Sequence, residues 1–173
     1  MTTHALRRAL ELHDASAEAL LAAATSVADG RWHDALAEGK WTPAQIVAHL
    51  IATYDILLQE LRGGEGMKIR TRFFQRILLR LLLRPGLLAG RGFPKRAPAP
   101  RETRPAERGP DRDEALSMFR ERCGELQTLA IAAPPSQRLT HAYFGTAPVD
   151  QGLTLCARHI DHHRAQLETL RSE

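Results

Sequence analysis

The sequence predicts an all-α protein whose core is a bundle of four helices. Four segments carry apolar residues at alternating three- and four-residue spacing, which places these residues on one helical face. Turn residues separate the segments, and no segment shows a convincing strand pattern. A chain of 173 residues suits one domain with its own core. We therefore expect residues 1–173 to form a single domain with a basic, proline-rich insertion at about 65–110.

The first helix is expected to begin after Thr2 or Thr3, because either side chain can cap a helix N-terminus. It should continue to about Ala28 and end at Asp29-Gly30. His4, His13 and His33 are expected to be solvent-exposed or to lie on helix faces.

The second helix has the clearest start signal in the chain. Thr42 is a good N-cap, Pro43 suits the first helical position, and an apolar-periodic run follows. Gly63-Gly64 should end the helix. The expected buried face is wide: Ile46, Val47, Leu50, Ile51, Tyr54, Leu57, Leu58 and Leu61.

The connection to the third helix is strongly basic. Residues 67–112 hold 13 Lys/Arg and 3 Asp/Glu, about +10, whereas the rest of the chain carries about −6. We expect a short amphipathic helix broken at Pro85-Gly86, followed by an extended linker. The simplest interpretation is a solvated cover packed by its own apolar residues: Phe73, Phe74, Ile77, Leu78 and Leu81. Interspersed arginines argue against a transmembrane span.

The third helix should begin at Asp111, with Glu114 three residues later in a variant of the capping box. It should end before Pro134-Pro135, and the segment 140-THAYFGTAP-148 is expected to be a loop. The fourth helix should start near Pro148 and run to the C-terminus.

Histidines interrupt the apolar face of this fourth helix. Positions 149, 153, 156, 160, 163, 167 and 170 step by four and three, and only His163 among them is polar. His159 lies one turn earlier on the same face, so the pair can direct two imidazole nitrogens at one point. His162 lies toward the flank and is the weaker candidate.

A third ligand is needed for a metal site, and His49 of the second helix is the candidate. It would face His159 and His163 if the second and fourth helices adjoin. Three neutral imidazoles would leave a coordination position open, as in catalytic metal sites. The competing interpretation is that an inward histidine is simply a hydrogen-bonded core residue, and spacing alone does not decide between them.

Three motifs resemble the DinB-like superfamily: 41-WTPAQIVAHL-50, 141-HAYFG-145 and 159-HIDHHRAQL-167. The last two are similar to a bacterial branch without an assigned function, in which Ala142 is usually Pro and Arg158 is usually Lys. The resemblance implies an up-down-down-up four-helix bundle with a long connection between helices two and three. It also implies a metal site formed by His49, His159 and His163, and leaves open whether His162 or His141 takes part.

The metal implied by the resemblance is a divalent transition ion, most commonly nickel or zinc and sometimes iron or manganese. Relatives of this kind suggest a metal-dependent thiol S-transferase or hydrolase acting on a small molecule such as a low-molecular-weight thiol. No catalytic side chain or organic cofactor site is assigned. Gln166 and Glu60 are candidates for orienting the imidazoles, although both residue types are more often ordinary surface groups.

The alternative function is a non-catalytic binding or stress-response module whose basic segment contacts an anionic partner, either a nucleic acid or a membrane surface. Nucleic acid is disfavoured because aromatic residues make up only 5% of the chain and no reading motif is present. Pairing into a homodimer through an exposed apolar face is a further hypothesis. Two cysteines without metal-type spacing, and the absence of a signal-peptide pattern, favour a cytoplasmic setting.

Overall fold

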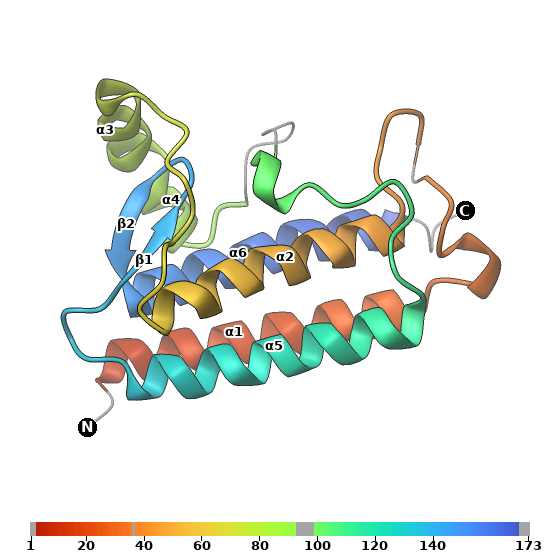
Figure 1. Cartoon of the computed structure of the whole chain (residues 1–173), viewed down its shortest axis with the longest axis horizontal. Helices are drawn as coiled ribbons and strands as arrows, with labels where there is room; N and C mark the ends of the chain where they lie inside the picture. The colour runs from red at the N-terminus through yellow and green to blue at the C-terminus, as the bar shows by residue number, and fades with distance from the viewer. Residues whose placement is uncertain (1–2, 36, 93–98, 170–173) are drawn as a thin grey trace.

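The computed structural model describes residues 3–35, 37–92 and 99–169, and four long helices dominate it (Figure 1). These helices are α1 (His4–Thr25), α2 (Pro43–Leu61), α5 (Arg112–Ala132) and α6 (Val149–Glu168). The shorter elements are η1 (Asp29–Arg31), α3 (Phe73–Leu82), α4 (Arg84–Leu88), η2 (Arg101–Thr103), β1 (Arg138–His141) and β2 (Gly145–Pro148).

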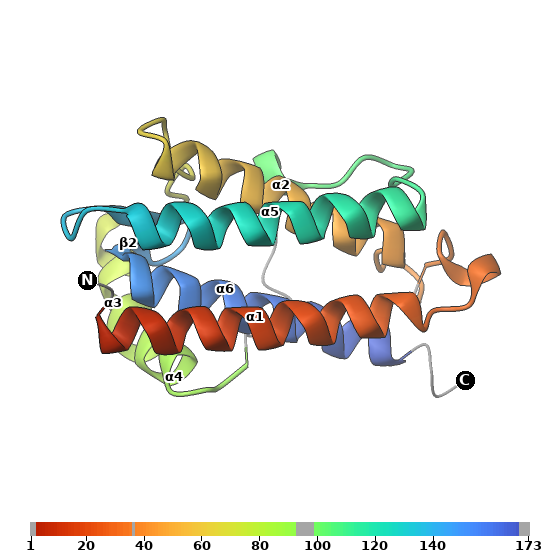
Figure 2. The ribbon, with the colours of Figure 1, turned by 90° about the horizontal axis from the view of Figure 1, so that it is seen from below.

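The four long helices run up, down, down and up, as the resemblance implied. Figure 1 shows α1 and α6 running in one direction and α2 and α5 in the other. α1 packs most extensively on α6, and α2 on α5, which Figure 2 shows from a second side. The long connection between α2 and α5 allows these two neighbours to be parallel, because the chain must return along the whole bundle between them.

The starts of α1 and α2 follow the predicted signals. The Thr3 side chain accepts a hydrogen bond from the backbone N–H of Leu6 at 3.2 Å. Thr42 and Gln45 form a reciprocal capping box, with Pro43 in the first turn. These local interactions define the residue at which α2 begins, and so define where His49 lies on the helix, about two turns later. The capping box predicted at Asp111 is wrong, because Asp111 precedes α5 without a side-chain cap hydrogen bond.

The bundle core consists of apolar side chains contributed by all four helices. Burying each large side chain of this kind stabilises the fold by roughly 1.5–3 kcal/mol. Fully buried examples are Leu20 of α1, Leu50 and Leu58 of α2, Phe119 and Leu126 of α5, and Leu153, Ile160 and Leu167 of α6.

The expectation that residues 140–148 form a loop is wrong, because they lie largely in a β-hairpin. β1 and β2 pair antiparallel, with Leu139 opposite Ala147 and His141 opposite Gly145. Gly145 has φ +72°, a conformation that glycine adopts without strain. The Glu60 carboxylate of α2 accepts hydrogen bonds from the Thr140 N–H at 2.8 Å and hydroxyl at 2.5 Å. The hairpin is thereby attached to α2, and the all-α class holds apart from this small sheet.

The basic connection differs from its expected form in two ways. Its helix breaks at Leu83, and Pro85 and Gly86 lie in the first turns of α4. The five apolar side chains expected to pack this cover are exposed to solvent instead. The expected extended linker falls partly on residues 93–98, which lie outside the described residues.

The part of the linker that follows is held against the start of α2. The Gln45 side-chain amide donates to the carbonyl of Glu107 at 2.8 Å, and the Trp32 indole donates to that of Pro110 at 2.9 Å. A Cβ atom at Gly109 would lie 2.6 Å from the carbonyl carbon of Ala44, so only glycine allows this close approach. The linker is thus positioned next to the helix that carries His49.

His13 lies on the buried face of α1, so the expected helix-face position is correct and the expected solvent exposure is not. Its Nε2 lies 2.6 Å from the Tyr54 hydroxyl, and Tyr54 also contacts Cys123. Burial lowers the pKa of His13 to about 4, opposed by the nearby Asp14 carboxylate, so the ring is neutral near pH 7. His4 and His33 are exposed, as expected.

Candidate metal centre

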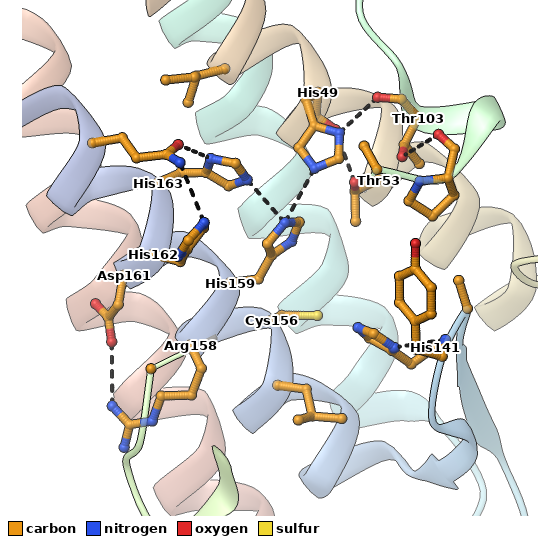
Figure 3. A pocket seen from close by; sticks show the side chains of 18 of the residues that line it. His49, Thr53, Thr103, His141, Cys156, Arg158, His159, Asp161, His162 and His163 are labelled. Carbon is orange, nitrogen blue, oxygen red and sulfur yellow. Dashed lines mark hydrogen bonds and ion pairs between the residues drawn. The ribbon is translucent and has the colours of Figure 1, made fainter. Parts of the chain in front are cut away.

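Three histidines from two helices converge at one point between α2 and α6. Nε2 of His159 lies 3.2 Å from Nε2 of His49 and 3.0 Å from Nε2 of His163 (Figure 3). One nitrogen from each ring lies within 4.8 Å of the others. For comparison, nitrogens that share a tetrahedral metal at about 2.0–2.1 Å lie about 3.3 Å apart. The two shorter separations therefore fit nitrogens that share one ion.

Hydrogen bonds at the far sides of two rings fix where their protons lie. His49 Nδ1 is 2.7 Å from the backbone carbonyl of Thr103, which can only accept, so Nδ1–H donates. His163 Nδ1 is 2.8 Å from Oε1 of Gln166 and donates in the same way. The amide nitrogen of Gln166 lies 3.3 Å from Nε2 of His162, consistent with this orientation of the amide. Gln166 therefore orients His163, as predicted from its position.

These two tautomers direct two unprotonated nitrogens at the third ring. In their neutral forms, His49 and His163 both present an Nε2 lone pair to Nε2 of His159. The His159 nitrogen carries at most one proton, which cannot donate fully to both neighbours. A cation between the rings would satisfy all three lone pairs at once, so the donor set fits a transition-metal ion better than it fits three rings alone.

The surroundings keep all three rings neutral. Burial, together with the neighbouring His163 and His49, holds the pKa of His159 well below its usual value. Burial also lowers the pKa of His163 to about 3, with a further contribution from His49. The pKa of His49 is lowered by burial, in part opposed by its bond to Thr103. Neutral imidazole is the form that binds metals, so these side chains do not need to lose a proton near pH 7.

Two contributors to the site were missed by the sequence analysis. Thr103 acts through its backbone carbonyl in η2, and backbone groups carry no residue-type signal. Trp41 packs its ring 4.9 Å from the His49 ring centroid and 6.3 Å from that of His163, nearly parallel to the latter. The position of Trp41 just before the Thr42 N-cap could have indicated this contact, because a residue there lies beside the first turns of α2.

A cavity of about 1010 Å³ adjoins the three histidines. Apolar residues of α2, α6 and the hairpin form much of its wall, and Met67 and Gly90 of the long connection also line it. This size is at the upper end for small-molecule sites. Cys156 lies along the wall, and burial raises the pKa of its thiol to about 12. Its thiol is therefore protonated near pH 7.

His141 lines the same cavity from the hairpin, beyond Cys156 in the view of Figure 3. Its Nδ1 accepts a hydrogen bond from the Tyr143 N–H at 3.2 Å, and its ring stacks on Phe144. Burial lowers the pKa of His141 to about 4. Because Nδ1 accepts, the neutral ring carries its proton on Nε2.

The remaining candidates lie apart from the converging nitrogens. His162 is not among the three and accepts from Gln166 at the flank, where the sequence placed it. Glu60, the second candidate for orienting an imidazole, instead binds Thr140 of the hairpin through its carboxylate. Among the described helices, none is both long enough and apolar enough to pass through a bilayer.

Comparisons with known proteins identify a family over most of this architecture. A family model described as the DinB superfamily matches residues 12–167. A solved structure described as TT2238, a four-helix bundle protein, superposes with a TM-score of 0.57 at 22% identity. The superposition covers 97% of this chain and 99% of that one, and shows the fold alone. No curated protein matches the chain.

Proposed function

The chain belongs to the DinB superfamily, and we propose that it binds one divalent transition-metal ion through His49, His159 and His163. The observation that carries this proposal is the convergence of three Nε2 atoms, two of them with their Nδ1 protons already engaged. A core histidine kept only for packing would need one partner and would not direct its free lone pair at a second imidazole. Nickel and zinc are the proposed ions, with iron or manganese also compatible with imidazole ligands.

The proposed activity is metal-dependent transfer of a small thiol, or hydrolysis, in the adjoining cavity. When bound, a divalent cation supplies a Lewis acid that lowers the pKa of a coordinated thiol or water toward neutrality. The chain provides three imidazole ligands and an adjoining cavity whose wall is largely apolar.

The state of the cysteines supports an external nucleophile. Burial raises the pKa of both Cys123 and Cys156 to about 12, so neither offers a thiolate near pH 7. A reaction that depends on a nucleophilic sulfur would need a thiol brought in as substrate. Both thiols are free, which suits a reducing compartment, and we place the protein in the cytoplasm on that basis.

The activity is tested with protein loaded with zinc or nickel and incubated with a small thiol and a set of electrophiles, alongside ester and amide substrates. We expect turnover of one class, its loss on chelation, and its return when the metal is restored. His159→Ala should abolish the activity, whereas His162→Ala should retain most of it, because His162 lies at the flank.

A protein that holds the metal but turns over neither class would contradict the proposed catalysis. That result would favour the alternative of a non-catalytic binding or stress-response module. Loss of activity in His162→Ala with full metal content would instead place a reacting group at the flank of the site.

A further inference from the structure

The helix α3 presents an apolar face to solvent rather than to the bundle. Its exposed apolar side chains span about half of the helix circumference at 100° per residue. We call them the outer face of α3: Phe73, Phe74, Ile77, Leu78, Leu81 and Leu82. Phe74 is 81% exposed and Leu78 is 57% exposed. A contiguous exposed apolar surface of this kind marks an interaction site.

The opposite side of α3 is attached to the protein. Leu79 packs against a buried cluster of Leu87, Phe144 and Leu155, which joins α4, the hairpin and α6. Just before the helix, Arg70 N–H donates to the carbonyl of Ala142 at 2.8 Å, and the Thr71 hydroxyl donates to that of Tyr143 at 3.2 Å. α3 is therefore mounted on the hairpin with its outer face turned away. Figure 1 shows it projecting beside the hairpin, away from α1 and α5.

The segment that carries this face has charged residues of one sign only. Residues 66–92 contain seven Lys/Arg and no Asp/Glu. Arg76 and Arg80 flank the outer face, and the guanidinium of Arg76 lies 5.8 Å from the ring centroid of Phe73. A helix with a wide apolar face, bordered by arginines and lacking acidic residues, matches the chemistry of an anionic lipid surface.

The same charge pattern disfavours a second copy of this chain as the occupant. Pairing two outer faces around a two-fold axis would bring identical patches together. Each patch would then place its arginines near those of its partner, and residues 66–92 offer no carboxylate to offset them. Nucleic acid would engage the arginines but would leave the six apolar side chains exposed to water.

We propose that the outer face of α3 docks this protein onto anionic membranes as a peripheral, interfacial helix. The apolar side chains would enter the boundary between headgroups and acyl chains, while Arg72, Arg76 and Arg80 would pair with lipid phosphates. The inference is independent of the metal site, although Met67 and Gly90 of the same connection line the cavity. Docking would thus bring the cavity close to the lipid surface.

The test is co-sedimentation of the full chain with vesicles. Vesicles of phosphatidylcholine with about 30 mol % phosphatidylglycerol should retain the protein, and vesicles of phosphatidylcholine alone should retain at least about tenfold less. The double variant Phe74→Glu/Leu78→Glu should lose binding to the anionic vesicles. Replacing Arg72 and Arg80 with glutamine should weaken it by roughly fivefold for each arginine.

The matched control is Ile131→Glu in α5, which places the same charge on another exposed apolar side chain, here 55% exposed. It should bind like the wild type. The proposal is overturned if the wild type does not bind anionic vesicles, or if Phe74→Glu/Leu78→Glu binds them as well as the wild type. It is also overturned if the outer-face variant only dissociates a dimer, or only releases DNA, with no vesicle binding by the wild type.

Discussion

Replacing His163 with alanine is expected to weaken the binding of zinc or nickel by at least about a hundredfold. Losing even an orienting partner of a metal ligand typically costs 10–100-fold in affinity, and this change removes a ligand itself. His49→Ala should have an effect of the same order, since it removes a ligand from the opposite helix. The measurement is competition against a chelator of known affinity, with protein purified without a histidine tag.

The matched control for this result is His162→Ala, which removes an adjacent histidine from the same helix. His162 is not one of the converging ligands, so its loss should leave affinity within about tenfold of the wild type, through its contact with Gln166. Equal losses in His162→Ala and His163→Ala would contradict the assignment, because they would indicate a diffuse histidine-rich surface rather than a defined triad.

Replacing Leu153 with alanine should lower the free energy of unfolding by about 2–5 kcal/mol. Leu153 is fully buried on the apolar face of α6, so its truncation leaves a cavity as well as removing apolar contacts. Urea denaturation of the metal-free protein measures the change. The value should approach the upper end of this range if the surrounding core side chains cannot close the space.

His163→Leu should not lower the free energy of unfolding, although it changes another residue on the same face of α6. His163 is only 5% exposed, and a leucine there would complete the apolar repeat between Ile160 and Leu167. The metal-free variant should be at least as stable as the metal-free wild type, since binding sites are commonly held at some expense of stability. Destabilisation as large as that of Leu153→Ala would show that His163 is a structural core residue, and would contradict the proposed role.

The helices could be predicted because their signals are local. Thr42, Pro43 and Gln45 specify the start of α2 within four residues, and the apolar period identifies its buried face. The hairpin was missed because each strand has only four residues, too few for alternation to stand out from a turn-rich segment. Its attachment to the bundle uses Glu60 of α2, which lies 80 residues away in sequence from Thr140.

The sequence indicated the three histidine side chains that converge in the structure, but not the backbone carbonyl that binds one of them. His163 stood out as the polar residue among seven regularly spaced positions of α6. His159 was then a candidate because it lies one helical turn earlier on the same face. The Thr103 carbonyl could not be anticipated, because its position depends on how the linker returns over α2 at Gly109. The periodicity of α3 likewise predicts an amphipathic helix, but only the three-dimensional packing of Leu79 shows that the apolar face is turned outward.

The central claim is that three imidazoles from α2 and α6 hold one metal ion, and X-ray absorption spectroscopy of the zinc-loaded protein tests it most directly. We expect a first coordination shell with three imidazole nitrogens at about 2.0–2.1 Å and no sulfur scatterer. His163→Ala should lose one imidazole from that shell or lose the metal. A shell containing sulfur, or fewer than three imidazoles in the wild type, or a protein that takes up no metal, would contradict the claim.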